Sequence, residues 1–137
     1  MQNKMWINLV HLGSNMWNEE GNRAGRENRS TPEASPVLRF DRKLWDDYML
    51  YMKNAGVNAL VIDVGEAMRY ESHPELAVEG SWDHDQMRNE VKRLQAMGFE
   101  VIPKLNFSAC HDIWLKEYSR MLSTKPYYAV CRDVIRE

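Results

Sequence analysis

Polar side chains suited to chemistry gather at the end of a short apolar run in the second half of the chain. The run Phe99–Asn106 ends with Lys104 and Asn106, and His111 follows it. In α/β folds, the ends of strands and the loops after them hold the groups that bind and transform ligands. An amine, an amide and an imidazole at such an end favour a polar ligand, and this run is the strongest functional signal in the sequence.

Two earlier apolar runs, Trp6–Leu12 and Val57–Val64, also end in polar or charged residues. If the three runs are parallel strands, their carboxyl ends meet at one rim and their side chains converge there. The rim candidates are His11, Asn15 and Trp17 after the first run, Asp63, Glu66, Arg69, Tyr70 and His73 after the second, and Lys104, Asn106, His111 and Asp112 after the third.

This mixture of carboxylates, amides, imidazoles and aromatic rings is typical of carbohydrate sites. Sugar hydroxyls need closely spaced polar partners, and the C–H face of a sugar ring packs on an aromatic ring. Trp17 lies in a polar segment without an apolar stripe, which favours a ligand-binding role. Trp45 and Trp82 stand beside helix starts, and their spacing predicts core positions. We therefore predict a carbohydrate ligand.

Asp63 and Glu66 suggest an acid and base pair, because most glycosidases place two carboxyl groups about 5 to 9.5 Å apart across the scissile bond. A structural role for Asp63, accepting backbone hydrogen bonds at the strand end, is equally compatible with its position. Glu66 also fits an ordinary surface charge. No complete catalytic set is visible, so the catalytic residues stay unassigned.

Metal and cofactor chemistry are disfavoured by spacing. A barrel metallohydrolase shows His-x-His on its first strand, but Leu9 and Gly13 flank His11 at that spacing. The two cysteines do not have the spacing of a zinc site, and no glycine-rich phosphate loop is present. We expect no metal and no cofactor, and a metal-dependent hydrolase that uses His11, His111 and Asp112 remains the least favoured alternative.

A helix is predicted after Asp41, whose side chain is a typical N-cap. Phe40 and Trp45 flank this cap at the spacing of a hydrophobic staple, and Gly56 ends the helix. The apolar face predicted for this helix consists of Leu44, Trp45, Tyr48, Met52 and Ala55.

The same pattern returns at Asp83, with Gln86 completing a capping box and Gly98 ending the helix. Its predicted buried stripe is Met87, Val91 and Leu94. Further helices are predicted from Trp114 to Leu122 and from Pro126 onward. The apolar face predicted for the last helix is Val130, Val134 and Ile135.

The alternation of strands and helices predicts parallel βα units joined by right-handed crossovers. Segments after strands are long, at 13–36 and 65–82, whereas those after helices shrink to one glycine, as in barrel enzymes. We expect one domain over residues 1–137, the first three strands of a TIM (β/α)8 barrel, with a small open α/β sheet as the alternative. The polar loop 13–36 is either disordered or a cover over the ligand.

Composition excludes several classes. The 137 residues are 44% hydrophobic and 28% charged, ordinary values for a globular protein, and no apolar run approaches the ~20 residues needed to span a bilayer. The net charge of -2 gives no general attraction to nucleic acid. The N-terminus lacks the core of a signal peptide, so a cytoplasmic location is the default expectation unless the chain was cut from a longer secreted protein.

Residues 41–112 resemble the front of a glycoside hydrolase family 20 barrel, a family that hydrolyses terminal N-acetylhexosamines. The resemblance rests on Val57-Asn-Ala-Leu-Val-Ile-Asp63, His73-Pro-Glu-Leu76, Val101-Ile-Pro103 and His111. It implies a barrel fold, a sugar-like ligand, and Asp63 and His111 as site positions. The family has Glu and Asp where Lys104 and Asn106 stand, and its catalytic pair follows the fourth strand.

The sequence therefore predicts a glycoside hydrolase-like barrel portion that binds a carbohydrate, with acid and base on later strands and an inactive isolated portion. The predicted binding residues are Asp63, Lys104, Asn106, His111, His11, Trp17, Glu66 and Tyr70. The alternative is a non-catalytic α/β binding module that self-associates or pairs with a partner through exposed sheet edges.

Overall fold

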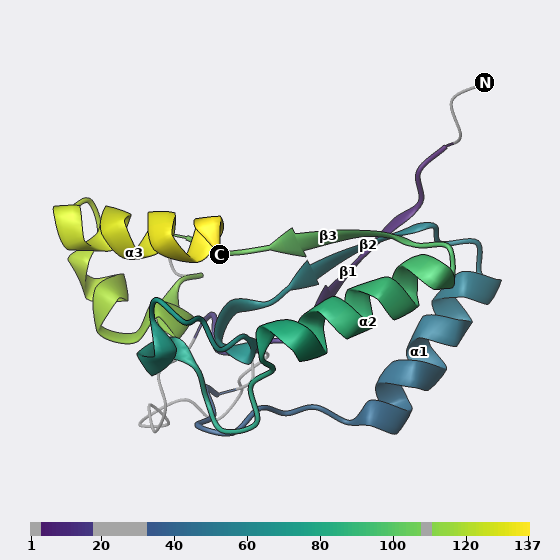
Figure 1. Ribbon diagram of the computed structural model, residues 1–137, viewed down its shortest axis with the longest axis horizontal. Coiled ribbons are helices and arrows are strands. Elements are labelled where there is room, and N and C mark those ends of the chain that lie inside the picture. The colour runs from purple at the N-terminus through teal and green to yellow at the C-terminus, as the bar shows by residue number, and fades with distance from the viewer. Residues whose placement is uncertain (1–3, 18–32, 108–110) are drawn as a thin grey trace, which may run out of the picture.

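The computed structural model describes residues 4–17, 33–107 and 111–137. Its centre is a sheet of three parallel strands in the order β1-β2-β3 (Figure 1). The strands are β1 (Ile7–His11), β2 (Ala59–Asp63) and β3 (Glu100–Lys104), each inside an apolar run predicted from the sequence. The parallel α/β class is confirmed.

Two helices, α1 (Arg42–Asn54) and α2 (His84–Ala96), connect the strands and lie on the same face of the sheet (Figure 1). Two crossovers of the same hand between neighbouring strands produce this one-sided cover. On the covered face Leu60 is fully buried in the core. The opposite face lacks such a cover at β1, where Ile7 is 52% and Leu9 46% exposed.

Both predicted helix starts are confirmed. The Asp41 carboxylate accepts a hydrogen bond of 2.8 Å from the Leu44 backbone N–H, and the Phe40 and Trp45 rings lie 5.7 Å apart. At the start of α2, Asp83 and Gln86 form both hydrogen bonds of the capping box. These contacts involve residues close in sequence, which is why the sequence predicts them.

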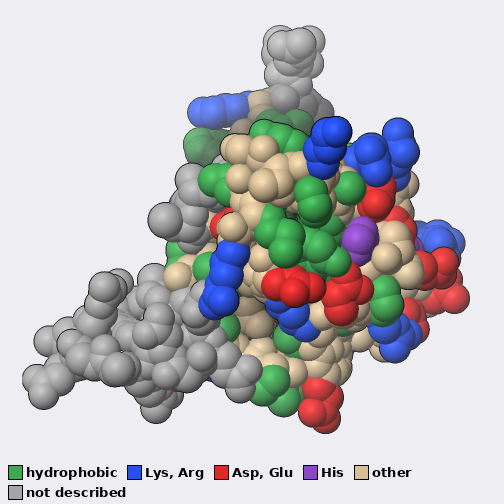
Figure 2. Space-filling view, turned by 90° about the vertical axis from the view of Figure 1, so that its left-hand side faces the viewer, with side chains coloured by type: hydrophobic (Ala, Val, Ile, Leu, Met, Phe, Trp, Pro, Cys, Tyr) green, Lys and Arg blue, Asp and Glu red, His purple; other side chains and the backbone are tan. Residues whose placement is uncertain are grey.

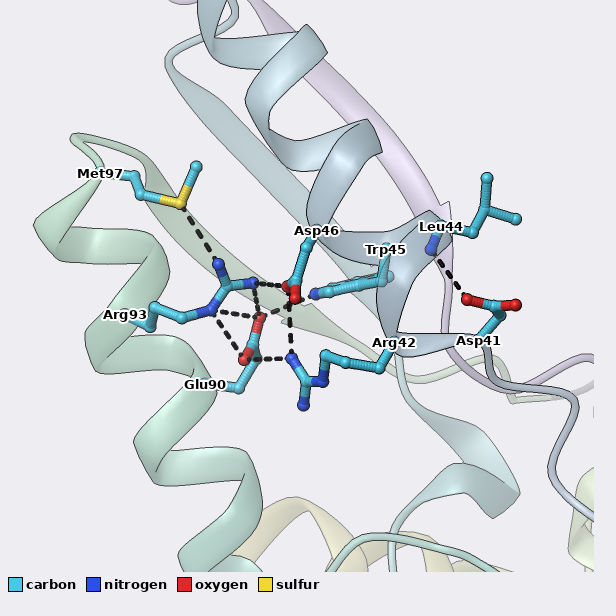
Figure 3. Close-up of polar contacts among 8 residues, drawn as sticks. All are labelled: Asp41, Arg42, Leu44, Trp45, Asp46, Glu90, Arg93 and Met97. Atoms are coloured by element: carbon cyan, nitrogen blue, oxygen red, sulfur yellow. Dashed lines mark hydrogen bonds and ion pairs between the residues drawn. The ribbon is translucent and has the colours of Figure 1, made fainter.

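A charge cluster around the buried Glu90 joins α1 to α2 (Figure 3). The Glu90 carboxylate accepts hydrogen bonds from Trp45 Nε1 at 2.7 Å, from Arg42 Nη1 at 3.0 Å and from Arg93, while Arg93 also reaches Asp46 at 2.9 Å. Burial alone would raise the pKa of Glu90, but the hydrogen bonds from Arg93, Trp45 and Arg42 outweigh it and lower the pKa. Glu90 therefore remains ionised between the two helices.

The segment after β2 contains two short 3-10 helices, η1 (Gly65–Ala67) and η2 (Pro74–Leu76). An isolated parallel bridge joins Met68 to Trp82 and closes the segment on itself. Trp45 and Trp82 are buried in the core, as predicted.

The helix predicted from Trp114 to Leu122 is wrong in type. Residues Ile113–Met121 form η3, two 3-10 pieces joined at Lys116, whose backbone has φ 54° and ψ -124°. The Lys116 ammonium donates to the carbonyl oxygens of Glu75 and Ala77, the latter at 3.1 Å. This contact with a distant segment accompanies the break, and the apolar spacing gave no signal of it.

The last helix, α3 (Lys125–Arg136), begins one residue before the predicted start at Pro126, and Thr124 is its N-cap. Val130 and Val134 are buried as predicted, but Ile135 is 63% exposed and its predicted burial is wrong. The buried stripe of α3 runs through Tyr127, Val130, Cys131 and Val134. In the described ranges, no helix is long and apolar enough to cross a bilayer.

Candidate functional site

Three predicted rim residues, His11, Asp63 and Lys104, form a row across the sheet. His11 pairs with Asp63, and Asp63 pairs with Lys104, at the last position of each strand. Residues paired in parallel register point to the same face, and here it is the face opposite α1 and α2. The parallel topology therefore brings together side chains that lie far apart in the sequence.

Asp63 is the centre of this row and is fully buried. Its Oδ2 accepts hydrogen bonds from Lys104 Nζ at 2.6 Å and from the Asn106 amide, and His11 Nδ1 lies 3.5 Å away. Its Oδ1 is buried without a hydrogen-bond partner in the part of the chain that the structure describes. One carboxylate oxygen of Asp63 thus contacts three side chains, and the other has no hydrogen bond among the described residues to offset its burial.

Asn106 is fixed by several contacts. Its side-chain oxygen accepts from Lys104, its Nδ2 lies 2.8 Å from the sulfur of Met16, and its backbone carbonyl accepts from Trp114 Nε1 at 2.7 Å. Met16 was not predicted from the sequence. A methionine directly before Trp17 in a polar segment was the available signal, and it is too weak to decide between core and site.

Trp17 lies between two imidazoles at the edge of the row. The centroid of its ring lies 5.7 Å from that of His11 and 6.2 Å from that of His111, with the ring planes at 73° and 81°. Both histidines are exposed, and Trp17 is half-buried. The structure thus brings six of the predicted residues into one connected set, which we call the rim cluster. Its members are His11, Trp17, Asp63, Lys104, Asn106 and His111.

Glu66 lies apart from the contacts of the rim cluster. Its buried Oε1 accepts from the backbone N–H of Ser14 at 2.6 Å and of Asn15 at 2.8 Å. Its Oε2 is buried without a hydrogen-bond partner among the described residues. Burial raises the pKa of Glu66, and the two backbone donors only partly offset that effect.

Tyr70 points elsewhere. Its hydroxyl donates to the Gly65 carbonyl at 3.1 Å, its ring lies 6.2 Å from Trp114, and burial raises its pKa. Asp112 accepts from Tyr127 at 3.0 Å, and Arg69 lies 3.8 Å from Asp83. These contacts of Tyr70, Asp112 and Arg69 are therefore with residues outside the row of His11, Asp63 and Lys104.

His73 also turns away from the row. Its ring lies 2.9 Å from Glu75 and 3.6 Å from Asp133 of α3. Figure 2 shows the end of the molecule that carries η3 and α3, where acidic side chains and a histidine border a hydrophobic patch. His73 thus takes part in docking α3.

Two hollows lie outside the contacts of the rim cluster. A cavity of about 490 Å³ is bordered by segments 34–36 and 77–79 and by η3, with Glu66 in its lining. An apolar groove of about 670 Å³ lies between α2 and α3 beside β3. Met87 and Val91 line this groove and are only half-buried, so their predicted full burial is wrong, whereas Leu94 is fully buried.

In the described residues, no three His, Cys, Asp or Glu side chains lie close enough together to hold a metal ion. The set His11, His111 and Asp112 is thus not assembled as a metal site. Cys131 is a free, buried thiol. Cys110 and residues 18–32 of the predicted polar loop lie outside the described residues.

No family model matches the chain, and no curated protein matches it.

Proposed function

We propose that the chain forms the first three units of a glycoside hydrolase-like (β/α) barrel and binds a carbohydrate at the carboxyl ends of β1, β2 and β3. The rim cluster is the observation that carries this proposal. In barrel enzymes, ligands bind at this end of the strands.

The barrel part of the proposal is supported by the cover of the sheet. Barrel strands have helices on the outer face only, and their inner face packs against the other strands. Here α1 and α2 lie on one face, and the exposed side chains of Ile7 and Leu9 lie on the other. Further parallel strands would close over these side chains.

The carbohydrate part is supported by the chemistry of the rim cluster. Trp17 is a half-buried aromatic ring, and the exposed His11 and His111, whose rings are roughly perpendicular to it, can exchange hydrogen bonds with hydroxyls. The Lys104 ammonium is already engaged by Asp63 and Asn106, so it provides a fixed donor rather than a free nucleophile. The resemblance to family 20 glycoside hydrolases also implies a sugar, with Asp63 and His111 as site positions.

The set is suited to binding more than to catalysis. The Asp63 carboxylate is committed to Lys104 and Asn106, and the Glu66 carboxylate to two backbone N–H groups. Acid and base therefore belong on later strands, as the resemblance implies. We expect this chain alone to bind N-acetylhexosamines without hydrolysing chromogenic glycosides.

The test is a titration of the protein with N-acetylglucosamine and with a panel of other monosaccharides, in which binding is monitored by NMR. We expect the Trp17→Ala variant to bind at least about 10-fold more weakly, the loss of roughly 1.4 kcal/mol of stacking. The control is Trp6→Ala, because Trp6 is 56% exposed at the opposite end of β1. No binding to any sugar, or an equal loss in both variants, would contradict the proposal.

A second candidate is a non-catalytic interaction module. It is favoured by a row of exposed apolar side chains along and before the edge strand β1, namely Met5, Trp6, Ile7 and Leu9. Such an edge pairs readily with another strand. A molar mass of two chains in light scattering after size exclusion would favour this candidate, and a monomer that binds sugar would exclude it.

A further inference from the structure

Glu66 is a buried carboxylate that the proposed function does not use directly. Only one of its oxygens has hydrogen-bond partners among the described residues, and both partners are backbone N–H groups, of Ser14 and Asn15. A half-satisfied buried carboxylate is costly, so its presence calls for a reason.

The backbone that Glu66 holds leads directly to the rim cluster. The Leu12 and Gly13 N–H groups donate to the Asp63 carbonyl at 2.8 and 3.2 Å, and Glu66 takes the next two N–H groups. Met16, which touches Asn106, and Trp17 follow at once. Four consecutive N–H groups are thus anchored to the end of β2 and the turn after it.

The side chain of Asn15 fixes the same turn from the other side. Its amide nitrogen donates to the Ser35 carbonyl at 2.8 Å, and its oxygen accepts from the Ser35 N–H at 2.9 Å. The turn is therefore clamped between Glu66 and Ser35.

Gly13 shows how closely Glu66 approaches this turn. A Cβ atom at position 13 would lie 2.7 Å from Glu66 Oε2 and 3.0 Å from the Val64 carbonyl oxygen. Any side chain there would push the turn and the carboxylate apart. The close approach provides an independent way to disturb the same contact.

We propose that Glu66 is a positioning residue that sets the place of Trp17 in the rim cluster by holding the backbone N–H groups of Ser14 and Asn15. The inference rests on the proposed function for its biological meaning, since Trp17 is there the surface on which the sugar ring packs. The positioning itself is a property of the chain without ligand.

The experiment uses the chain labelled with 5-fluorotryptophan and ¹⁹F NMR without ligand. The five tryptophans give five signals, and Trp17→Phe identifies the signal of Trp17. We expect Glu66→Ala to shift this signal and to leave those of Trp45 and Trp82, which lie in the α1 and α2 core, in place. Glu66→Gln retains an acceptor oxygen and should keep the Trp17 signal at its wild-type position.

A folded Glu66→Ala variant with an unmoved Trp17 signal overturns the inference, as does a Gln variant that shifts the signal as far as Ala. If Glu66→Ala does not fold, Gly13→Ala takes its place, with a shifted Trp17 signal expected and an unmoved one contradicting the inference. Because no sugar is present, failure of sugar binding leaves this result intact. If the wild type binds N-acetylglucosamine, Glu66→Ala should weaken that binding and Glu66→Gln should not.

Discussion

Two buried glutamates in this chain differ because of their partners. Glu90 faces two guanidinium groups and an indole N–H, which lower its pKa, whereas Glu66 faces only backbone N–H groups and burial raises its pKa. Similar burial therefore gives opposite dependences of stability on pH. For Glu66 the effect of burial on the pKa prevails, whereas for Glu90 the hydrogen bonds prevail over burial.

For Glu66 the folded chain holds a proton over a pH range in which the unfolded chain has lost it. The ionised carboxylate thus lowers the free energy of unfolding at neutral pH, and this penalty disappears as the pH falls below the unfolded value of about 4.3. We therefore expect wild type to gain stability relative to the Glu66→Gln variant when the pH is lowered from about 7 to about 4. Urea denaturation at both pH values measures this change, and a constant difference contradicts it.

The pairing of Lys104 with Asp63 predicts a strong mutational effect. Lys104→Met leaves a fully buried carboxylate without its cation, which should lower the free energy of unfolding by about 3 kcal/mol. The double variant Lys104→Met, Asp63→Leu removes both charges and should recover most of that loss. Urea denaturation of the single and double variants tests this, and additive losses would contradict the coupling.

At the level of elements, α1 and α2 are held together through Glu90. Its pKa is lowered, so its stabilising effect is present above the unfolded pKa of about 4.3 and is lost as the pH falls through the folded pKa. Wild type should lose stability in this acid range. The Glu90→Gln variant should be less stable than wild type at neutral pH but should lose less stability on acidification. Asp85→Asn is the control on the same helix, because the Asp85 side chain is 83% exposed. Thermal melts across the acid range give the comparison.

The sequence predicts those elements whose determinants are local. The caps at Asp41 and Asp83 depend on residues three or four positions away, and both form as expected. The break at Lys116 accompanies contacts with carbonyl groups about forty positions earlier, which periodicity does not register. For the same reason a regular helix was predicted where η3 stands.

The candidate site divides in the same way. His11, Asp63 and Lys104 converge because strand ends in a parallel sheet share an edge, and this follows from the order of elements. Glu66 and Tyr70 lie in the segment after β2, where tertiary packing directs them to Ser14 and to Gly65. Their place in sugar binding stays a prediction.

On the scale of the whole molecule, the two faces of the sheet differ in tolerance to charge. Leu9 is 46% exposed on the face without helices, so Leu9→Lys should change the free energy of unfolding by no more than about 0.5 kcal/mol. Leu60→Lys, at a fully buried position on the helix-covered face, should prevent folding. Circular dichroism melts separate the two cases, and equal damage would contradict the difference between the faces.

The flanks of the sheet are unequal as well. The backbone groups of Glu100 and Lys104 point toward β2. Backbone groups alternate along a strand, so the backbone of Pro103 points toward the free edge of β3, where proline has no N–H to donate. A strand from another chain that pairs with the free edge of β3 finds no hydrogen-bond donor at Pro103, whereas β1 contains no proline. Edge-to-edge pairing of two chains would consequently use β1 and not β3, and it would give dimers instead of fibres.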